Sequence, residues 1–336
     1  PLIIEPKKET LSYDREYTLV LDDWLDGSPE DVFSKLKGNA GTNSMPGMDH
    51  GKMPMNQNNS GMDSMEMEEG ADVNYSSFLI NGRTPESPTE FIVKNGEKIR
   101  LRVINASGST GFRFAVGGHK LTVTHADAFA VKPVEVDNFE ISPGERYDVL
   151  ISAKNVGVWM IAAMSTDEAA RGGKAILRYS EAQASSAPPP QTIPDEIKGQ
   201  KLNYAQLAAG DEVVTLSAEE PNRRLEINLG GQMSPYIWTL NGKMFPAEPF
   251  KIRAGERVRV SMINHSLMRH PMHIHGHSFS LHNGQNRSPV KDTVIVEPMM
   301  GKVEFDFLAD NPGDWLFHCH HAYHMEAGMM RVVKYV

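Results

Sequence analysis

The sequence repeats itself at a spacing of about 160 residues, and this repeat limits what the chain can fold into. An Asn-Gly pair at residues 81–82 precedes KNGEKIRLRVINAS at 94–107, and an Asn-Gly pair at 241–242 precedes RAGERVRVSMINHS at 253–266. Each block contains a Gly-Glu turn and then an alternating apolar and polar run, which is typical of a half-buried strand. Solenoid repeats are only about 20–50 residues long, so the chain is predicted to contain two duplicated domains.

The rest of the chain favours an all-β fold. Short runs rich in Val, Ile, Thr and Phe alternate with Gly, Pro, Asn and Asp, for example at 17–21, 99–104, 258–263 and 293–296. This pattern predicts β-sandwich or β-barrel domains. Consecutive prolines in SSAPPPQTIP indicate a Pro-rich linker, which gives a first domain at 10–182, a linker at 183–199 and a second domain at 200–336.

Composition excludes some partners and raises one cofactor question. The chain has 336 residues and a net charge of −9 without a basic cluster, which argues against nucleic-acid binding. No apolar run approaches the roughly 18 residues of a membrane span. One cysteine stands among 19 methionines and 13 histidines, a set of ligands that suits a soft metal.

A Met-rich insert at 39–74 interrupts the first domain. Its Gly and Asn content and lack of large aliphatic residues predict a mobile loop. One interpretation is a disordered loop in which the methionines have no role. The other is capture of Cu(I) by thioethers, since soft sulfur selects a soft cation. The methionines concerned are Met45, Met48, Met53, Met55, Met62, Met65 and Met67.

Ten of the 13 histidines lie between residues 265 and 324, in the segments HPMHIHGH at 270–277 and HCHHAYHMEAGMM at 318–330. Residues two apart on a strand share a face. His318 and His320 should therefore point one way and Cys319 the other, as His273 and His275 share a face of their own strand. Metals bound on the two faces would be joined covalently through Cys319 and its neighbours.

Two His, one Cys and a weak axial Met make an electron-transfer copper site. The partners available to Cys319 are His270, His324 and Met329, with Met330 as the axial alternative. Zinc is the rival metal, but it favours four-ligand tetrahedral sites. His119, His125 and His282 are interpreted as satisfied structural histidines.

These segments resemble the multicopper oxidases, the family of laccases, ascorbate oxidase and bacterial copper-resistance oxidases. ISPGERYD at 141–148 and DNPGDWLFH at 310–318 are similar to this family too. The His-rich end and the Met-rich insert look most like periplasmic copper-resistance oxidases. The resemblance implies Greek-key cupredoxin domains, copper as the only cofactor, O2 as co-substrate, and export to the periplasm or the extracellular space.

Carried over by residue, the resemblance implies copper ligands of three types. Type 1 copper would bind His270, Cys319, His324 and Met329. Type 2 copper would bind His273, and type 3 copper would bind His275, His318 and His320. The family oxidises four substrate equivalents at type 1 copper, and electrons pass through Cys319, His318 and His320 to a trinuclear cluster that reduces O2 to water.

The family's cluster needs eight histidines in four His-x-His pairs, and this chain contains two pairs. We therefore expect an N-terminal cupredoxin domain, present as a separate or cleaved polypeptide, to supply the other four. Residues 1–9 resemble the end of such a domain. Related oxidases often place a proton-donating Glu directly after the last type 1 His. Here that position is Met325, and Glu326 is the candidate donor one residue later.

The substrate is expected to be a phenol, an aromatic amine or Cu(I), with electrons entering at an exposed edge of His270 or His324. Two alternatives have different functions. One is a copper-binding or electron-transfer module without O2 turnover, and the other is a two-domain protein like nitrite reductase.

Overall fold

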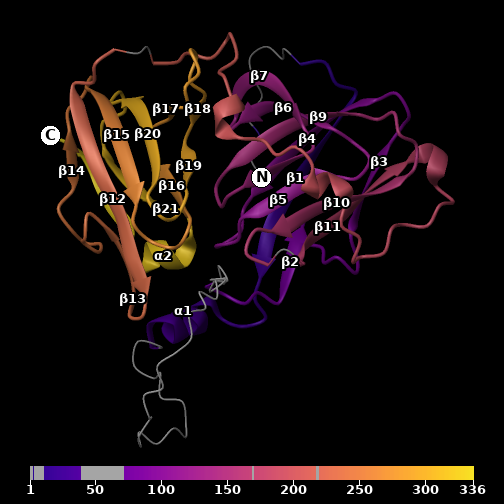
Figure 1. The fold of residues 1–336 in the computed structure, drawn as a ribbon, viewed down its shortest axis with the longest axis horizontal. Helices are drawn as coiled ribbons and strands as arrows, with labels where there is room; N and C mark the ends of the chain where they lie inside the picture. Colours follow the sequence, from indigo (N-terminus) through magenta and orange to yellow (C-terminus); the bar gives the residue numbers. More distant parts are fainter. Residues whose placement is uncertain (1–2, 4–10, 39–71, 169, 217–218) are drawn as a thin grey trace, which may run out of the picture.

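The computed structural model describes residues 3, 11–38, 72–168, 170–216 and 219–336. Twenty-two strands form four sheets in this part of the chain, so the all-β prediction is confirmed. Two β domains lie side by side (Figure 1). The described residues contain no helix that is long and apolar enough to span a membrane.

The first domain is built from two sheets. Their orders are β2-β1-β4-β9-β6-β7 and β3-β11-β10-β5-β8. The strands are β1 (Arg15–Trp24), β2 (Ser77–Ile80), β3 (Thr89–Val93), β4 (Lys98–Asn105), β5 (Phe112–Val116), β6 (Leu121–Ala126), β7 (Phe129–Val136), β8 (Asn138–Ile141), β9 (Arg146–Ser152), β10 (Val158–Ser165) and β11 (Gly172–Tyr179).

The second domain has the same topology. Adding eleven to each strand number of the first domain gives the strand orders of the second. They are β13-β12-β15-β20-β17-β18 and β14-β22-β21-β16-β19. The strands are β12 (Arg223–Met233), β13 (Tyr236–Leu240), β14 (Phe250–Ile252), β15 (Arg257–Asn264), β16 (His270–Ile274), β17 (Phe279–Leu281), β18 (Val290–Lys291), β19 (Thr293–Val296), β20 (Gly301–Leu308), β21 (Asp314–Cys319) and β22 (Met330–Tyr335).

The repeat extends to individual hydrogen bonds. Asn105 ends β4, and its buried amide donates to the carbonyls of Thr110 and Ile141 at 2.9 Å each. Asn264 ends β15, and its amide donates to the carbonyls of Met268 and Val296 at 2.7 and 3.1 Å. Each side chain closes the turn after its strand and connects that turn to the opposite sheet. The two repeated sequence blocks therefore have the same structural role.

Two histidines that are not candidate ligands are paired with tyrosines in the same repeated way. His119 Nε2 lies 2.7 Å from the hydroxyl of Tyr179, and His277 Nε2 lies 2.7 Å from that of Tyr335. His282 contacts the carboxylate of Glu304 at 2.9 Å. These pairs are structural, which is the role expected from the sequence for His119 and His282.

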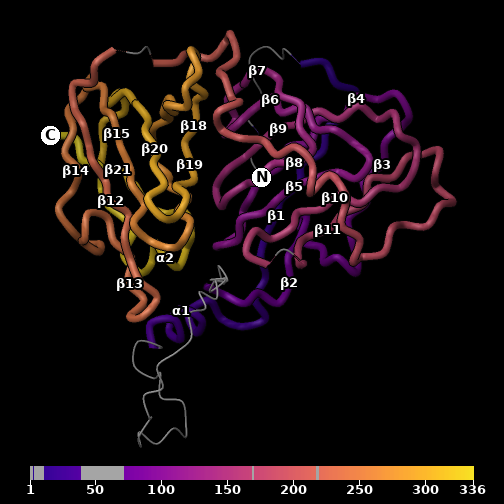
Figure 2. Tube along the Cα trace, viewed as in Figure 1, coloured from indigo at the N-terminus to yellow at the C-terminus, as the bar shows by residue number. Residues whose placement is uncertain are grey.

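Helical structure is short. The α-helices are α1 (Pro29–Gly38) and α2 (Ala322–Glu326), and the 3-10 helices are η1 (Ser180–Ala182), η2 (Asp195–Lys198) and η3 (Tyr204–Gln206). The segment predicted as a linker lies against the first domain, where the amide of Asn138 donates to the carbonyls of Glu196 and Gly199. The trace continues from there into the second domain (Figure 2).

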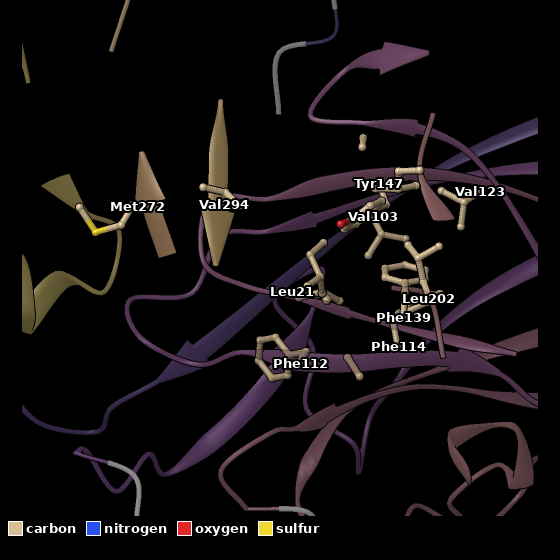
Figure 3. Packing of buried hydrophobic residues seen from close by; sticks show 14 of the residues in the cluster. Leu21, Val103, Phe112, Phe114, Val123, Phe139, Tyr147, Leu202, Met272 and Val294 are labelled. Carbon is tan, nitrogen blue, oxygen red and sulfur yellow. The ribbon is translucent and has the colours of Figure 1, made fainter. Parts of the chain in front are cut away.

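Each domain buries its apolar side chains between its two sheets. In the first domain, Leu21 and Val103 from one sheet face Phe112 and Phe139 from the other (Figure 3). The core continues into the second domain, where β16 contributes Met272 and is packed at both faces. A strand buried in this way is a rigid support for the side chains at its edge.

Parts of the sequence prediction fall on residues that are not described. The methionines of the predicted insert, Met45, Met48, Met53, Met55, Met62, Met65 and Met67, lie outside the described residues. The same holds for residues 1–9 except residue 3. The described chain resumes at Asp72, which proves important for the site.

Candidate metal centre

Antiparallel pairing of β16 with β21 brings the two His-rich segments together. Met272 is opposite Cys319, and His273 is opposite His318. Since side chains alternate across a strand, His270 and Cys319 face the core of the second domain. His273 and His275 face the other way, together with His318. The structure thus sorts the motif into two groups on opposite faces.

The core-facing group brings together Cys319, His270 and His324, all with no exposed surface. The Cys319 sulfur lies 3.7 Å from His270 Nδ1 and 3.8 Å from His324 Nδ1, and the two nitrogens are 3.1 Å apart. These three atoms are close enough to bind one metal ion. The ring of Trp238 covers His324 at 4.0 Å between centroids.

The outer nitrogens of both imidazoles have partners that fix their tautomers. His324 Nε2 lies 2.9 Å from the Asp72 carboxylate, so this nitrogen carries the proton. Ser266 donates its hydroxyl proton to Asn264 and lies 2.7 Å from His270 Nε2, which therefore donates to it. Each Nδ1 is left with a bare lone pair directed at the other ring. Such a meeting of lone pairs is repulsive unless a cation lies between them.

Electrostatics favour the same interpretation. Burial lowers the pKa of His270 and of His324 well below the ordinary value, and burial raises the pKa of the Cys319 thiol far above its usual range. Neutral imidazoles are the form that binds metals, and a metal would displace the thiol proton. The residues present therefore fit a metal with nitrogen and sulfur preferences.

Met329 is placed beside this group by a tight turn after α2. Its amide donates to the His324 carbonyl at 3.0 Å, and its carbonyl accepts from the Cys319 amide at 3.1 Å. Gly328 has φ +117°, and a Cβ there would lie 2.9 Å from the Trp238 carbonyl. Only glycine fits, so this turn fixes the position of the buried Met329. Met330 begins β22 and pairs with His318.

The second group contains His273, His275, His318 and His320, with neighbouring ring centroids 5.0 to 5.8 Å apart. His275 Nε2 and His318 Nε2 are 3.0 Å apart. Most of these rings are half-buried. Burial lowers the pKa of His318 to about 4, and burial lowers that of His273 and His320 too. Neutral rings can converge in this way without charge repulsion.

Backbone carbonyls set the tautomers of two rings in the second group. His318 Nδ1 donates to the Cys319 carbonyl at 2.8 Å, and His273 Nδ1 donates to the Asp292 carbonyl at 2.8 Å. Nε2 of each ring is therefore free to act as a ligand. Such hydrogen bonds to the second ring nitrogen are typical of metal-binding histidines.

The first domain holds Asp292 in place. Arg146 donates two hydrogen bonds to the Asp292 carboxylate at 2.6 and 2.8 Å. Asp127 accepts the amides of Asp292 and Thr293 at 3.2 Å each. Asp127 also pairs with the fully buried Lys291 at 3.0 Å. These interdomain contacts reach His273 through one carbonyl, so the domain interface positions a candidate ligand.

Gly144 of the first domain packs directly on His320. Its φ is +85°, and a Cβ at this position would lie 2.5 Å from His320 Cδ2. The glycine in ISPGERYD therefore allows the close approach of the two domains at the ring.

Comparison with known proteins identifies the family. Two family profiles, both described as multicopper oxidase, match residues 15–182 and 219–336. The chain belongs to the multicopper oxidase family. Copper is the cofactor of this family and O2 its oxidant, and its members are oxidoreductases.

Individual relatives of known name support this family assignment. The chain is 36% identical to multicopper oxidase MmcO of Mycobacterium tuberculosis, over 100% of this chain and 65% of that protein. It is 26% identical to copper resistance protein A of Escherichia coli, over 99% of this chain and 74% of that protein. The chain thus spans just under two thirds of the length of MmcO.

Solved structures support the cupredoxin fold. Fet3p, a multicopper oxidase that functions in iron import, superposes with a TM-score of 0.79 at 19% identity, over 99% of this chain and 68% of that chain. A laccase from Botrytis aclada superposes with a TM-score of 0.72 at 21% identity, over 96% and 64%.

The burial of His270 and His324 and the exposure of Glu326 bear on two expectations from the sequence. Electron entry at an exposed edge of His270 or His324 is wrong, because both rings are fully buried and their outer nitrogens are hydrogen-bonded. His321 covers His324 instead, with stacked rings 3.7 Å apart. Glu326 is exposed at the end of α2, and its role as a proton donor stays a prediction.

Four residues of this multicopper oxidase site were missed by sequence reasoning: Asp72, Ser266, Arg146 and Asp292. Ser266 had a signal, because its Asn-x-Ser turn is repeated at 105–107. Arg146 lies in a family-like segment but carries no ligand signature. Asp72 and Asp292 are single carboxylates far from their partners in sequence, so only tertiary structure connects them to His324 and His273.

The Asp72 contact predicts how the reduction potential of a type 1 copper is tuned. Replacing Asp72 with Asn should raise this potential by tens of millivolts, because a hydrogen bond to a charged acceptor is stronger by about 1 kcal/mol. Tyr236 donates to the same carboxylate oxygen at 2.6 Å. Its replacement with Phe leaves that oxygen a better acceptor and should lower the potential. Redox titration of the blue absorption measures both, and shifts of equal sign would contradict the prediction.

The Arg146–Asp292 contact predicts the occupancy of a type 2 copper. Arg146→Gln should weaken type 2 copper binding by about 10–100-fold, as loss of supporting hydrogen bonds does at other metal sites, and should leave the blue band intact. Copper analysis with electron paramagnetic resonance measures this. Arg178→Gln is the matched control, since Arg178 makes a similar two-bond contact with Glu90 away from the site. Equal loss of type 2 copper in both variants would argue against a specific role.

Proposed function

We propose that this chain carries the electron-accepting and electron-transferring part of a multicopper oxidase that couples substrate oxidation to reduction of O2 to water. The observation that carries the proposal is the peptide 318–320, whose cysteine joins one imidazole group while its flanking histidines join the other. A single metal ion could not bind both groups, because they lie on opposite faces of the strand. The arrangement supports two communicating copper centres, in contrast to a simple copper-binding module.

In this proposal the core-facing group is the type 1 site. His270 and His324 would supply two nitrogens, Cys319 a thiolate and Met329 a weakly binding thioether. Copper in such a site accepts single electrons from the reductant. The protein fixes the ligand tautomers through Ser266 and Asp72 and excludes water by complete burial. Rigid ligands of this kind move little when the copper changes its oxidation state, so little energy is needed to rearrange the site during electron transfer.

The second group supplies half of a trinuclear cluster. His273 is the type 2 ligand, and His275, His318 and His320 are type 3 ligands. We propose that a further cupredoxin domain, separate or cleaved, contributes the other four histidines. The partly exposed rings of this group support the idea, in contrast to the fully buried type 1 set. The chain spans 65% of MmcO, which leaves room for such a domain in the whole protein.

Two classes of reductant remain candidates. A cavity of about 430 Å³ between the domains is lined by Asp72, Tyr75, Tyr147, Leu267 and His321 among others. Its aromatic and polar lining supports a phenol or aromatic amine, which would lie one stacked ring away from His324. The Met-rich insert supports Cu(I). The histidines of the second group support an O2-reducing oxidase more than a protein like nitrite reductase. We place the whole protein outside the cytoplasm, in the periplasm or beyond it.

Copper content and O2 uptake test the proposed function. The active preparation should contain four copper ions per functional unit, consume O2 with a phenol or Cu(I), and include every cluster histidine on identified polypeptides. Cys319→Ser should abolish the blue band near 600 nm and lower the oxidase activity at least 1,000-fold. The type 2 copper signal should persist. A fully active sample that consists of this chain alone would refute the missing domain. Nitrite reduction without O2 uptake would favour the nitrite reductase-like alternative.

The Cu(I) role of the insert needs a test that spares Asp72. Deleting 39–74 would remove the carboxylate that contacts His324, so the seven insert methionines should instead be changed to Leu. We expect Cu(I) oxidation to slow several-fold at low Cu(I) while phenol oxidation stays unchanged, because thioethers but not aliphatic chains bind Cu(I). Steady-state rates with both substrates measure this. Unchanged Cu(I) kinetics would refute the capture role.

A further inference from the structure

In the described part of the chain, four turns have two consecutive left-handed residues, and only one of them has two long side chains at these positions. The hairpin turn at Asp127-Ala128, between β6 and β7, has φ of 47° and 71°. The turns centred on Asn81-Gly82 and Asn241-Gly242 have φ of 53° and 71°, and of 53° and 70°. The turn centred on Met299-Met300 has φ of 52° and 70°. In the two Asn-Gly turns and the Met299-Met300 turn, the amide of the following residue donates back across the turn, at 3.1, 3.2 and 3.3 Å. All three are therefore turns with two left-handed central positions.

Such positions strongly favour Asn-Gly. The left-handed region is unfavourable for residues with a long side chain, so two consecutive methionines strain this turn. In the repeat, the hydrogen bond that Met300 makes to Asn264 is made by Gly144 to Asn105. The first domain thus has the unstrained residue at the same place. Strain of this kind at a defined position indicates a functional constraint.

The two side chains are also displayed to solvent. Met299 is 67% exposed and Met300 is 54% exposed, whereas methionines usually fill cores. Because more than half of each residue is in solvent, apolar burial contributes little to holding the two methionines in this turn. Their common property is a pair of accessible thioethers on a backbone fixed by hydrogen bonds.

This turn is connected to a candidate type 1 ligand. The Met299 amide donates to the Ser266 carbonyl at 3.0 Å, and the Met300 amide donates to the Asn264 carbonyl at 2.7 Å. The Ser266 hydroxyl contacts His270 Nε2 at 2.7 Å. One residue therefore links the methionine turn to the buried imidazole, on the side of the site opposite Asp72.

We propose that Met299 and Met300 form a docking site for a soft monovalent cation, Cu(I), and that its electron enters the oxidase through Ser266 and His270. This rests on the proposed Cu(I) oxidase function. The docked Cu(I) would give one electron to the oxidised copper that His270 would hold, and it would leave as Cu(II). Thioethers bind Cu(I) better than Cu(II), so the product is released from the turn.

Site-specific binding is measured on the fully reduced holoenzyme labelled with 13C-methyl methionine. Ag(I), a redox-inert soft cation, is the probe. We expect the Met299 and Met300 methyl signals to shift, and the shift to be absent in Met299→Leu/Met300→Leu. Met233→Leu, which changes another exposed methionine at the end of β12, should leave it unchanged. An Ag(I) titration that moves neither methyl signal overturns the site.

Kinetics and stability separate a functional from a structural role. The double Leu variant should lose at least tenfold in kcat/KM for Cu(I) and keep its phenol kcat/KM and blue band. Met299→Asn/Met300→Gly restores the residues that the turn favours, so it should raise Tm by a few degrees and lose Cu(I) turnover equally. Cu(I) kinetics within twofold of the parent in both variants overturn the electron-entry role. The parent enzyme could instead show the Ag(I) shifts and oxidise phenols but not Cu(I). This result would refute Cu(I) as the substrate, while the binding site for a soft cation would still be supported.

Discussion

The register between β16 and β21 is the constraint on which the site depends. It places Met272 opposite Cys319 and His273 opposite His318. A slip of one residue would send every side chain to the other face, and neither group of imidazoles would form. Burial of Met272 and Cys319 in the core opposes such a slip, so the apolar packing of the second domain enforces the geometry of its candidate metal ligands.

The domain interface completes what the register begins. The first domain contributes Asp72 to the outer nitrogen of His324, Arg146 to the segment that holds His273, and Gly144 to the face of His320. Although the domains are duplicates, the interface joins different surfaces of each, as in a head-to-tail association. The second domain contains the candidate ligands, and the first domain supports them. This division explains why only the second domain is rich in histidine.

Buried polar groups at this interface are costly unless they are paired, and the structure pairs them. Lys291 is fully buried between the carboxylates of Asp127 and Glu145 at 3.0 and 3.1 Å. Burial alone would lower the pKa of Lys291, but Asp127, Tyr147 and Glu145 together raise it further than burial lowers it. The lysine therefore stays charged and locks the domains together. Replacing Lys291 with an uncharged residue would leave the two buried carboxylates without the cation between them, so this position tolerates little change.

The sequence by itself determined the duplication, the all-β class and the family, since these follow from strand periodicity, a long repeat and short ligand motifs. The alternation around Cys319 also predicted two faces, because the period of a strand is a local property. Tertiary structure alone decided which distant carboxylates support the ligands. Asp72 and Asp292 meet His324 and His273 only after the chain folds, and a lone Asp carries no local signal. Burial of His270 and His324 was equally beyond the sequence, because exposure depends on what other elements cover a ring.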